Sequence, residues 1–258
     1  MKPFSFLLAF LLPGAYLSAQ QARFVSSGTI EFEKTANDYA LVNNGQYLGK
    51  NLAGSEQQLP EQYQKEHPQF IVSKSTLYFR DNKTLFVPDL LPATAMSMFS
   101  VPIAAQNNIV YSNFPADSLV VQKDVLGETF LLNDRARKTN WKITGETREI
   151  AGYTCRRANA LIMDSIYAVA FYTEQIHIPG GPESFSGLPG MILELALPHE
   201  HVTWRAVRVM DRALPPVPVT APKKGKPIDR RQLLDILSEA GKGRSQQGAS
   251  LIRKVNLL

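Results

Sequence analysis

Residues 75–88 read STLYFRDNKTLFVP, and this stretch indicates the fold class more clearly than any other part of the sequence. Two runs rich in β-branched and aromatic residues flank Asp81, Asn82 and Lys83, which are residue types that suit a tight turn. The stretch therefore predicts an antiparallel β-hairpin.

Strand patterns continue on both sides of this hairpin. In SGTIEFEK, residues 27–34, Ile30 and Phe32 share one face and alternate with Glu31 and Glu33. After the hairpin, runs at residues 108–114, 118–125 and 128–134 follow at roughly ten-residue spacing, which is typical of a meander.

The next strands come from residues 140–162, which predict a long strand pair turning at Gly152, and from three runs between residues 165 and 210. The expected fold class is all-β to α+β. We expect one curved antiparallel β-sheet, a half-barrel-like meander, with a C-terminal helix. By analogy of fold alone, this pattern is similar to the half-barrels of periplasmic lipid and lipoprotein carriers.

The composition changes after Met210. Residues 213–227, ALPPVPVTAPKKGKP, carry five prolines and predict an extended linker. IDRRQLLDILSEAGKG then predicts a helix, with Asp229 as its N-cap and Gly241 as its stop. The expected domains are residues 20–212 as a β-rich domain, 213–227 as a Pro/Lys-rich linker, and 228–258 as the helix and tail.

The N-terminus has the pattern of a secretory signal peptide. Lys2 precedes an apolar run from Phe4 to Leu12, and Leu17, Ser18 and Ala19 form a small-residue exit. The apolar run is too short to span a bilayer. We expect residues 1–19 to be cleaved near Ala19, which would place the mature protein in the periplasm or on the cell surface.

The sequence has a single cysteine, Cys155, so no internal disulfide can form. A small buried hydrophobic residue is the simpler interpretation of Cys155. The alternative is a thiolate activated by Arg156 and Arg157, although strand alternation turns Arg156 to the opposite face.

The net charge of +5 is concentrated at the C-terminus. Residues 221–258 hold nine Lys or Arg against three Asp or Glu, a net of +6, so the rest of the chain carries −1. This distribution describes a near-neutral body with a basic segment and argues against a nucleic-acid-binding domain. We expect no nucleic acid partner.

Catalytic motifs such as G-x-S-x-G and H-E-x-x-H are absent from the sequence. Glu174, Glu183 and Glu194 include candidates for an acid–base pair, with solvated surface carboxylates as the commoner alternative. We expect no enzymatic activity.

Three histidines, His177, His199 and His201, are the candidate metal ligands. His199 and His201 would share a face in a strand, a spacing that can bind a metal, but a polar turn between two strands is the alternative. His177 alternates with Ile176 and Ile178, which would leave it exposed if both isoleucines are buried. We expect no metal and no cofactor.

Residues 180–192, GGPESFSGLPGMI, contain four glycines and two prolines between two predicted strands. Proline fixes φ and glycine allows positive φ, so the stretch predicts a rigid, defined corner. With Tyr172, the side chains of Phe185, Leu188 and Met191 either line the lip of a binding cavity or fold back to cap the core.

The stretch GLPGMI, residues 187–192, resembles the signature of the GLPGLI family of exported Bacteroidetes proteins. The resemblance extends to GTIEFE near the start, to WKITGETREIAGYTCRRA, to FYTEQIHIPGGPESFSGLPGMILE, and to KKGKPIDRRQLLDIL before the C-terminal helix. The matching positions are Trp141, Ile143, Glu146, Thr147, Ile150, Gly152, Tyr153, Cys155, Ala158, Gly181, Pro182, Phe185, Gly187, Leu188, Pro189 and Gly190.

The departures from the family pattern are Phe171 where Trp is frequent, His177 where Pro is common, and Met191 where Leu is usual. A metal role of His177 would therefore not be a family trait. The resemblance implies a cell-envelope protein of unknown function and assigns no activity to any residue.

Three functions remain open from the sequence. The first is an exported binding or chaperone-like protein that holds an apolar ligand or client segment in the concave face of the sheet. The second is an accessory subunit of an outer-membrane transport or secretion complex, docking through Lys223, Lys224, Lys226, Arg230 and Arg231 to an acidic envelope partner or the membrane surface. The third is a metal-binding protein or hydrolase that uses the three histidines or Cys155.

Overall fold

The computed structural model describes residues 25–43, 65, 67–89, 107–163, 165–211 and 218–242. The predicted signal peptide, the first part of the linker and the tail beyond residue 242 lie outside these residues. The strands are β1 (Ser27–Asn37), β2 (Phe70–Arg80), β3 (Lys83–Pro88), β4 (Ile109–Asn113), β5 (Ser118–Val125), β6 (Glu128–Asp134), β7 (Lys142–Ile150), β8 (Tyr153–Ile162), β9 (Ile166–Thr173), β10 (Met191–Leu197), β11 (Val202–Met210) and β12 (Lys226–Ile228). The helices are α1 (Asp38–Asn43), the 3-10 turn η2 (Pro198–Glu200) and α3 (Arg230–Gly241).

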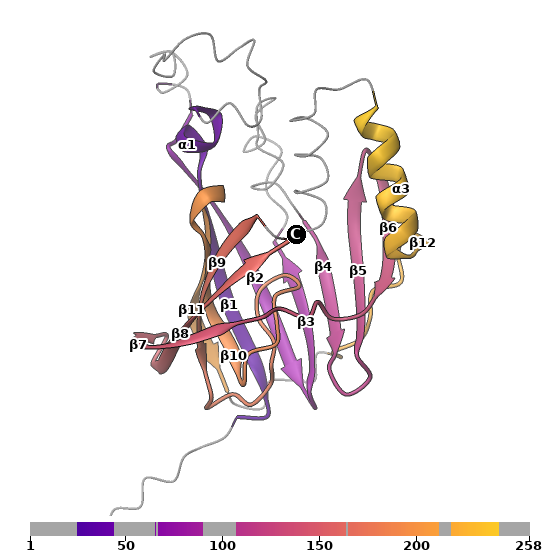
Figure 1. Cartoon of the computed structure of the whole chain (residues 1–258). Helices are drawn as coiled ribbons and strands as arrows, with labels where there is room; N and C mark the ends of the chain where they lie inside the picture. The colour runs from indigo at the N-terminus through magenta and orange to yellow at the C-terminus, as the bar shows by residue number, and fades with distance from the viewer. Residues whose placement is uncertain are drawn as a thin grey trace, which may run out of the picture.

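These strands form one open, curved, mixed sheet of 12 strands in the order β12-β6-β5-β4-β3-β2-β1-β11-β10-β9-β8-β7 (Figure 1). Strand β1 lies in the middle, with the meander β2 to β6 on one side and the strands β11 back to β7 on the other. Every neighbouring pair is antiparallel except β12 and β6. The expected curved sheet with a C-terminal helix is confirmed.

The hairpin at residues 75–88 forms as predicted. Arg80 pairs with Lys83, which leaves a two-residue turn between β2 and β3. Both turn residues have positive φ, 51° at Asp81 and 57° at Asn82. Positive φ at both positions is what a type I′ hairpin turn requires, and Asn and Asp adopt it more readily than most residues.

One face of the sheet carries most of the buried side chains, and we call it the inner face. On β1 the buried side chains include Ile30, Phe32 and Lys34, which alternate with partly exposed residues. On β2, Leu77 and Phe79 continue the same face through the antiparallel register. The core of the protein lies on this face, beneath α3 and the segment that joins β9 to β10.

Helix α3 packs on the inner side of the sheet edge at β6 (Figure 1). Asp229 is its N-cap, and the side chains and backbone of Asp229 and Gln232 form a reciprocal capping box. Leu233 and Leu237 are buried against the sheet, and the helix ends at Gly241 as predicted. The predicted N-cap and stop are therefore confirmed.

Strand β12 was not predicted, because its three residues straddle the expected boundary between linker and helix. It pairs in parallel with β6, with Lys226 opposite Phe130 and Ile228 opposite Leu132. This pairing covers the edge of β6 and delivers the chain directly to the N-cap of α3. No helix in the described ranges is long and apolar enough to cross a membrane.

Candidate functional site

The segment between β9 and β10 turns inward and covers the inner face, and we call residues 180–190 the plug loop. Short-range hydrogen bonds shape it: Gly187 N–H donates to the carbonyl of Pro179 over 3.1 Å, and Ile192 N–H donates to Gly180 over 2.8 Å. The indole N–H of Trp141 donates to the carbonyl of Ser186 over 2.9 Å. The two longest blocks of the GLPGLI-like sequence are thus in direct contact.

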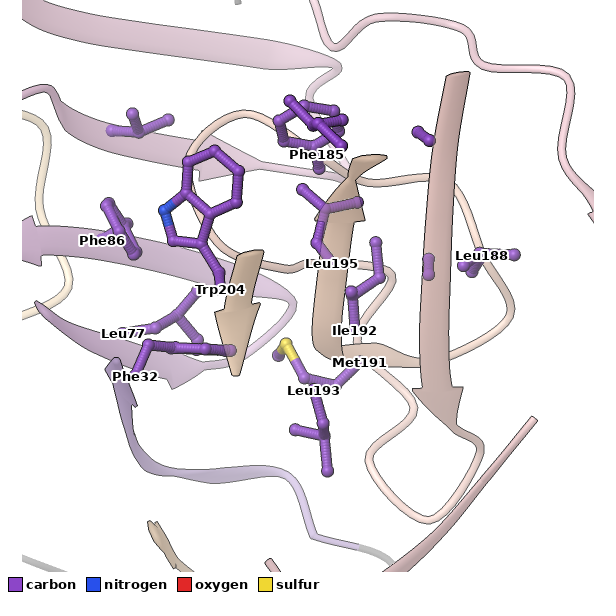
Figure 2. Packing of buried hydrophobic residues seen from close by; sticks show 14 of the residues in the cluster. Phe32, Leu77, Phe86, Phe185, Leu188, Met191, Ile192, Leu193, Leu195 and Trp204 are labelled. Carbon is purple, nitrogen blue, oxygen red and sulfur yellow. The ribbon is translucent and has the colours of Figure 1, made fainter. Parts of the chain in front are cut away.

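The side chains expected at a binding lip are instead buried in the core. Tyr172, Phe185, Leu188 and Met191 all have 5% or less of their surface exposed. The rings of Phe185 and Trp204 lie 6.2 Å apart, within the cluster shown in Figure 2. Of the two interpretations left open by the sequence, the one in which these residues fold back to cap the core is the one observed.

Glycine is required where the plug loop passes β9. A Cβ atom at Gly190 would lie 2.1 Å from the carbonyl oxygen of Thr173, so no side chain fits there. Gly187 has a φ of 96°, which favours glycine, and it faces the Trp141 ring. These contacts explain why a glycine-rich stretch can lie close against the sheet.

Glu183 is the buried charged residue of the plug loop. Its φ of 51° places a non-glycine residue in the left-handed region, a conformation that costs about 1 kcal/mol or more. Asn108 Nδ2 donates to Glu183 Oε2 over 3.3 Å. Lys34 on β1 and Lys123 on β5, both buried, supply the positive charges that attract the Glu183 carboxylate.

Burial dominates the protonation behaviour of these groups. Desolvation raises the pKa of Glu183, although Lys34, the Asn108 hydrogen bond and Lys123 all act to lower it. Desolvation also lowers the pKa of Lys34, and it lowers the pKa of Lys123 to about 8. Perturbed titratable groups gathered in one place are a recurrent mark of functional sites, and structural ion-pair networks produce them too.

A cavity of about 30 Å³ lies beside Glu183, between the plug loop, β4 to β6 and the start of α3. Its volume suits roughly two water molecules. The polar residues that line it are Asn108, Lys123, Asp134, Arg137, Glu183, Ser184 and Arg230. We call these residues without Ser184, together with Lys34, the inner charge cluster.

Lys34 is also held from its other side by an aromatic ring. Its Nζ atom lies 5.0 Å from the centroid of the Trp204 ring, within the range of a cation–π interaction. Trp204 also contacts Phe185 of the plug loop, so one indole ring packs against both Lys34 and the apolar part of this loop.

The sequence contains a signal for two members of this cluster, which were not predicted as site residues. Lys34 has the same strand parity as Ile30 and Phe32, and Lys123 has the parity of Leu119 and Val121. A lysine in phase with core residues points inward and needs a partner. Asn108 and Arg137 lie outside the strands, and no local pattern indicates their position.

Cys155 is fully buried, and its surroundings disfavour an activated thiolate. Burial raises the pKa of its thiol to about 12, and Glu149 and Glu194 add to the shift. Arg148 acts in the opposite direction and does not overcome them. Cys155 is the small buried hydrophobic residue that the sequence first suggested.

The three histidines do not form a metal site. His199 lies in the 3-10 turn η2 and His201 follows it with a φ of 51°, so the two do not alternate along a strand. His177 is exposed between the buried Ile176 and Ile178, as expected. Within the described ranges, no three His, Cys, Asp or Glu side chains come together in a way that could hold a metal ion.

The three candidate carboxylates have different cationic neighbours. Glu194 contacts Arg148 at 2.8 Å and Arg205 at 3.5 Å, and Glu174 contacts Arg156 at 3.3 Å. Glu183 belongs to the inner charge cluster. Each carboxylate therefore has its own ionic environment.

The basic C-terminal segment divides into two parts. Lys223, Lys224, Lys226 and Arg231 are exposed. Arg230 is different, because its Nε atom contacts Asp134 on β6 at 2.7 Å and its side chain lines the cavity. Arg230 anchors the start of α3 instead of extending the exposed basic surface.

A family model matches a short segment of this chain, and no activity is known for that family. Residues 161–194 match the model of a Bacteroidetes-associated domain described as a protein of unknown function (Porph_ging). The match runs from the end of β8 to the middle of β10 and includes the whole plug loop. No curated protein matches the chain.

Solved structures show similarity of fold. PNGF-II in the C2 and P21 space groups gives TM-scores of 0.51 and 0.50 at 14% and 15% identity, over 89% and 82% of this chain. Each alignment covers 33% of the PNGF-II chain, so this chain spans about a third of its length. An uncharacterized conserved protein from Thermus thermophilus gives a TM-score of 0.39 at 7% identity over 83% of this chain and 99% of that one, a likeness too weak for comparison.

Proposed function

We propose that this protein is an exported binding protein of the cell envelope, with its site at the inner charge cluster. The observation that carries the proposal is the burial of Lys34, Lys123 and Glu183 on a face that is otherwise largely apolar. Buried charges lower stability unless they are well paired, and a sheet that served only as a scaffold would gain from apolar residues at these positions. A ligand-binding role would explain why charged residues occupy these buried positions.

A binding role fits the cavity better than a catalytic one. The space beside Glu183 suits roughly two water molecules, which is too little for a substrate with a scissile bond between an acid and a base. It is enough for the end group of a ligand or of a client segment whose remainder lies outside. The plug loop already occupies the apolar part of the inner face, which favours a polar end group over a wholly apolar ligand.

Export and family membership belong to the same proposal. Export is supported by the signal-peptide pattern of residues 1–19. Membership of the GLPGLI family is supported by the GLPGMI stretch, which lies inside the matched segment 161–194, and by the contact between Trp141 and Ser186 that joins two of its sequence blocks.

The test is a native mass spectrum of the mature protein, purified from its own envelope fraction. We expect a chain that begins near residue 20 and carries a non-covalent adduct. Lys123→Met should lose the adduct, and the exposed Lys224→Met is the matched control that should retain it. A bare mass for the wild-type protein, or an adduct unchanged in Lys123→Met, would contradict the proposal.

A second candidate is docking to an acidic envelope partner or to the membrane surface. It is favoured by the exposure of Lys223, Lys224, Lys226 and Arg231 within a nine-residue stretch. Association with anionic vesicles should weaken when salt rises from about 50 to about 500 mM, on the order of tenfold or more. Binding that does not respond to salt, or to replacement of the three lysines by Gln, would argue against it.

A further inference from the structure

The cavity beside Glu183 lies between the sheet and two segments that cover it. Its floor is formed by β4, β5 and β6, each of which pairs with a neighbouring strand on both sides. The plug loop contributes Glu183 and Ser184 to the wall, and α3 contributes Arg230 and Leu233. The cavity holds about 30 Å³, so a ligand group larger than roughly two water molecules has to displace one of these two covers.

The plug loop is the more firmly attached of the two covers. Four of its side chains are buried, namely Glu183, Phe185, Ser186 and Leu188. Two hydrogen bonds tie it to distant parts of the chain, from Trp141 to Ser186 over 2.9 Å and from Asn108 to Glu183 over 3.3 Å. Opening the plug loop would break this packing and both hydrogen bonds together.

Helix α3 is attached through a smaller buried surface. Of its 12 residues, Leu233 and Leu237 are the buried ones. Arg230, at the start of the helix, contacts Asp134 on β6 at 2.7 Å, and the two side chains are 44% and 15% exposed. An ion pair that is open to solvent contributes little to stability and is weakened further by salt. Segments with few buried apolar side chains are the ones that open most readily.

The chain just before α3 can serve as a hinge. Ile228 is buried and pairs with Leu132, so β12 holds the helix to the edge of the sheet. Asp229, between β12 and α3, is exposed and has an extended backbone. Rotation at Asp229 would swing the helix away from the cavity without breaking the strand pairing. The capping box between Asp229 and Gln232 would move with the helix.

From this geometry we propose that α3 is a hinged gate over the cavity and that the ion pair between Arg230 and Asp134 is its latch. The inference rests on the proposed binding function and names the route by which a ligand reaches the site. Opening of α3 uncovers the apolar wall formed by the sheet, while the plug loop stays in place. The residues of this wall are Val110, Leu119, Val121 and Leu132.

The experiment measures how fast a buried thiol in the cavity reacts, and it needs no ligand. Val121 lines the cavity and is 5% exposed. Val121→Cys is made in a Cys155→Ala background, so that the new thiol is the only one in the chain. Its labelling by iodoacetamide is timed at pH 8. A second reporter, Leu188→Cys in the same background, measures opening of the plug loop.

Leu237→Ala tests the gate, because Leu237 is on the buried face of α3 and does not line the cavity. This truncation should speed the labelling of Val121→Cys by on the order of tenfold or more and leave Leu188→Cys unchanged. Leu197→Ala is the matched control, since Leu197 is buried in β10, away from the cavity, and should change neither rate. Circular dichroism checks that each variant is folded.

Salt tests the latch. Raising NaCl from about 50 to about 500 mM should speed the labelling of Val121→Cys about twofold, because salt screens the pair between Arg230 and Asp134. Asp134→Asn removes the latch, so labelling should already be faster at low salt and should no longer respond to salt. A salt response that persists in Asp134→Asn would overturn the role of this ion pair.

Two results would overturn the gate. An unchanged rate at Val121→Cys in Leu237→Ala would show that α3 is not the route into the cavity. Equal acceleration of Val121→Cys and Leu188→Cys would show that the protein opens as a whole or through the plug loop. Because no ligand takes part, either result leaves the proposed binding function standing. A bare native mass in a protein with gated labelling would overturn the binding function and leave the movement of α3 established.

Discussion

Asn108 and Glu183 are joined by a hydrogen bond of 3.3 Å that spans 75 positions of the chain. The bond connects the residue before β4 to the plug loop, so two halves of the sheet meet at one buried carboxylate. Lys34 from β1 and Lys123 from β5 approach the same group. The plug loop is thus held by charge at Glu183 and by apolar packing at Phe185.

The packing of Phe185 predicts a large loss of stability on truncation. Phe185→Ala removes a buried ring beside Trp204 and leaves a void that the plug loop fills only in part. The free energy of unfolding should fall by about 3–5 kcal/mol. Urea unfolding followed by circular dichroism measures it, and Leu161→Ala, at a 60% exposed position, should change stability by about 0.5 kcal/mol or less. A small effect for Phe185→Ala would show that the loop does not pack on the core.

Removing the hydrogen bond from Trp141 to Ser186 should cause a smaller loss of stability. Trp141→Phe keeps an aromatic ring but removes the indole donor, which leaves the carbonyl of a buried residue without that partner. The expected cost is about 1–3 kcal/mol. Amide hydrogen exchange should show faster exchange in residues 180–190 than in β1 or β2. Uniform acceleration across the sheet would contradict a local role for this bond.

Lys123 predicts a change in stability at alkaline pH. Its pKa is about 8 in the folded protein and near 10.5 in the unfolded chain, so the unfolded state binds the proton more tightly. Burying the charged form of Lys123 destabilises the fold. This destabilisation is complete below pH 8 and disappears as pH rises towards 10.5. Relative to Lys123→Met, the wild-type protein should therefore gain about 3 kcal/mol over this interval. Urea midpoints at pH 7.5, 8.5 and 9.5 test the trend.

A pH-independent difference between wild type and Lys123→Met would mean that Lys123 titrates normally. Lys224→Met serves as the control, because Lys224 is exposed and its removal should shift stability equally at each pH.

Cys155 predicts an unreactive thiol. At pH 8 its pKa of about 12 leaves almost no thiolate, and the side chain is shielded from reagent. Labelling with an aromatic disulfide reagent should be negligible in buffer and complete in denaturing urea. The pKa of the native thiol lies above the ordinary thiol pKa of 9.0. The contribution of the protonated thiol to stability is therefore complete below pH 9 and is lost as pH rises towards 12. Fast labelling of the native protein would contradict this account.

Local patterns in the sequence predicted most of the sheet. The turn at Asp81 and Asn82, the alternation in β1 and the N-cap at Asp229 each depend on neighbours within a few residues. The burial of Cys155 followed in the same way from its place in a strand. These elements are confirmed because nothing distant in the chain is needed to form them.

The direction of the plug loop could not be predicted, because it depends on contacts distant in sequence. Phe185 meets Trp204, and Glu183 meets Asn108, only after the sheet has curved. Alternation shows which side chains share a face but not which segment covers it. Strand β12 was missed for a similar reason, since three residues beside a proline-rich segment acquire strand structure only by pairing with β6.

The most direct test of the account compares two adjacent positions of the plug loop, Leu188, which is buried, and Pro189, which is exposed. Each is replaced by cysteine in a Cys155→Ala background, and thiol labelling is timed at pH 8. We predict that Pro189→Cys reacts at the rate of a free thiol and that Leu188→Cys is protected by on the order of a hundredfold or more. Equal, fast labelling at both positions would show that the loop is an open lip and would contradict its role as a plug.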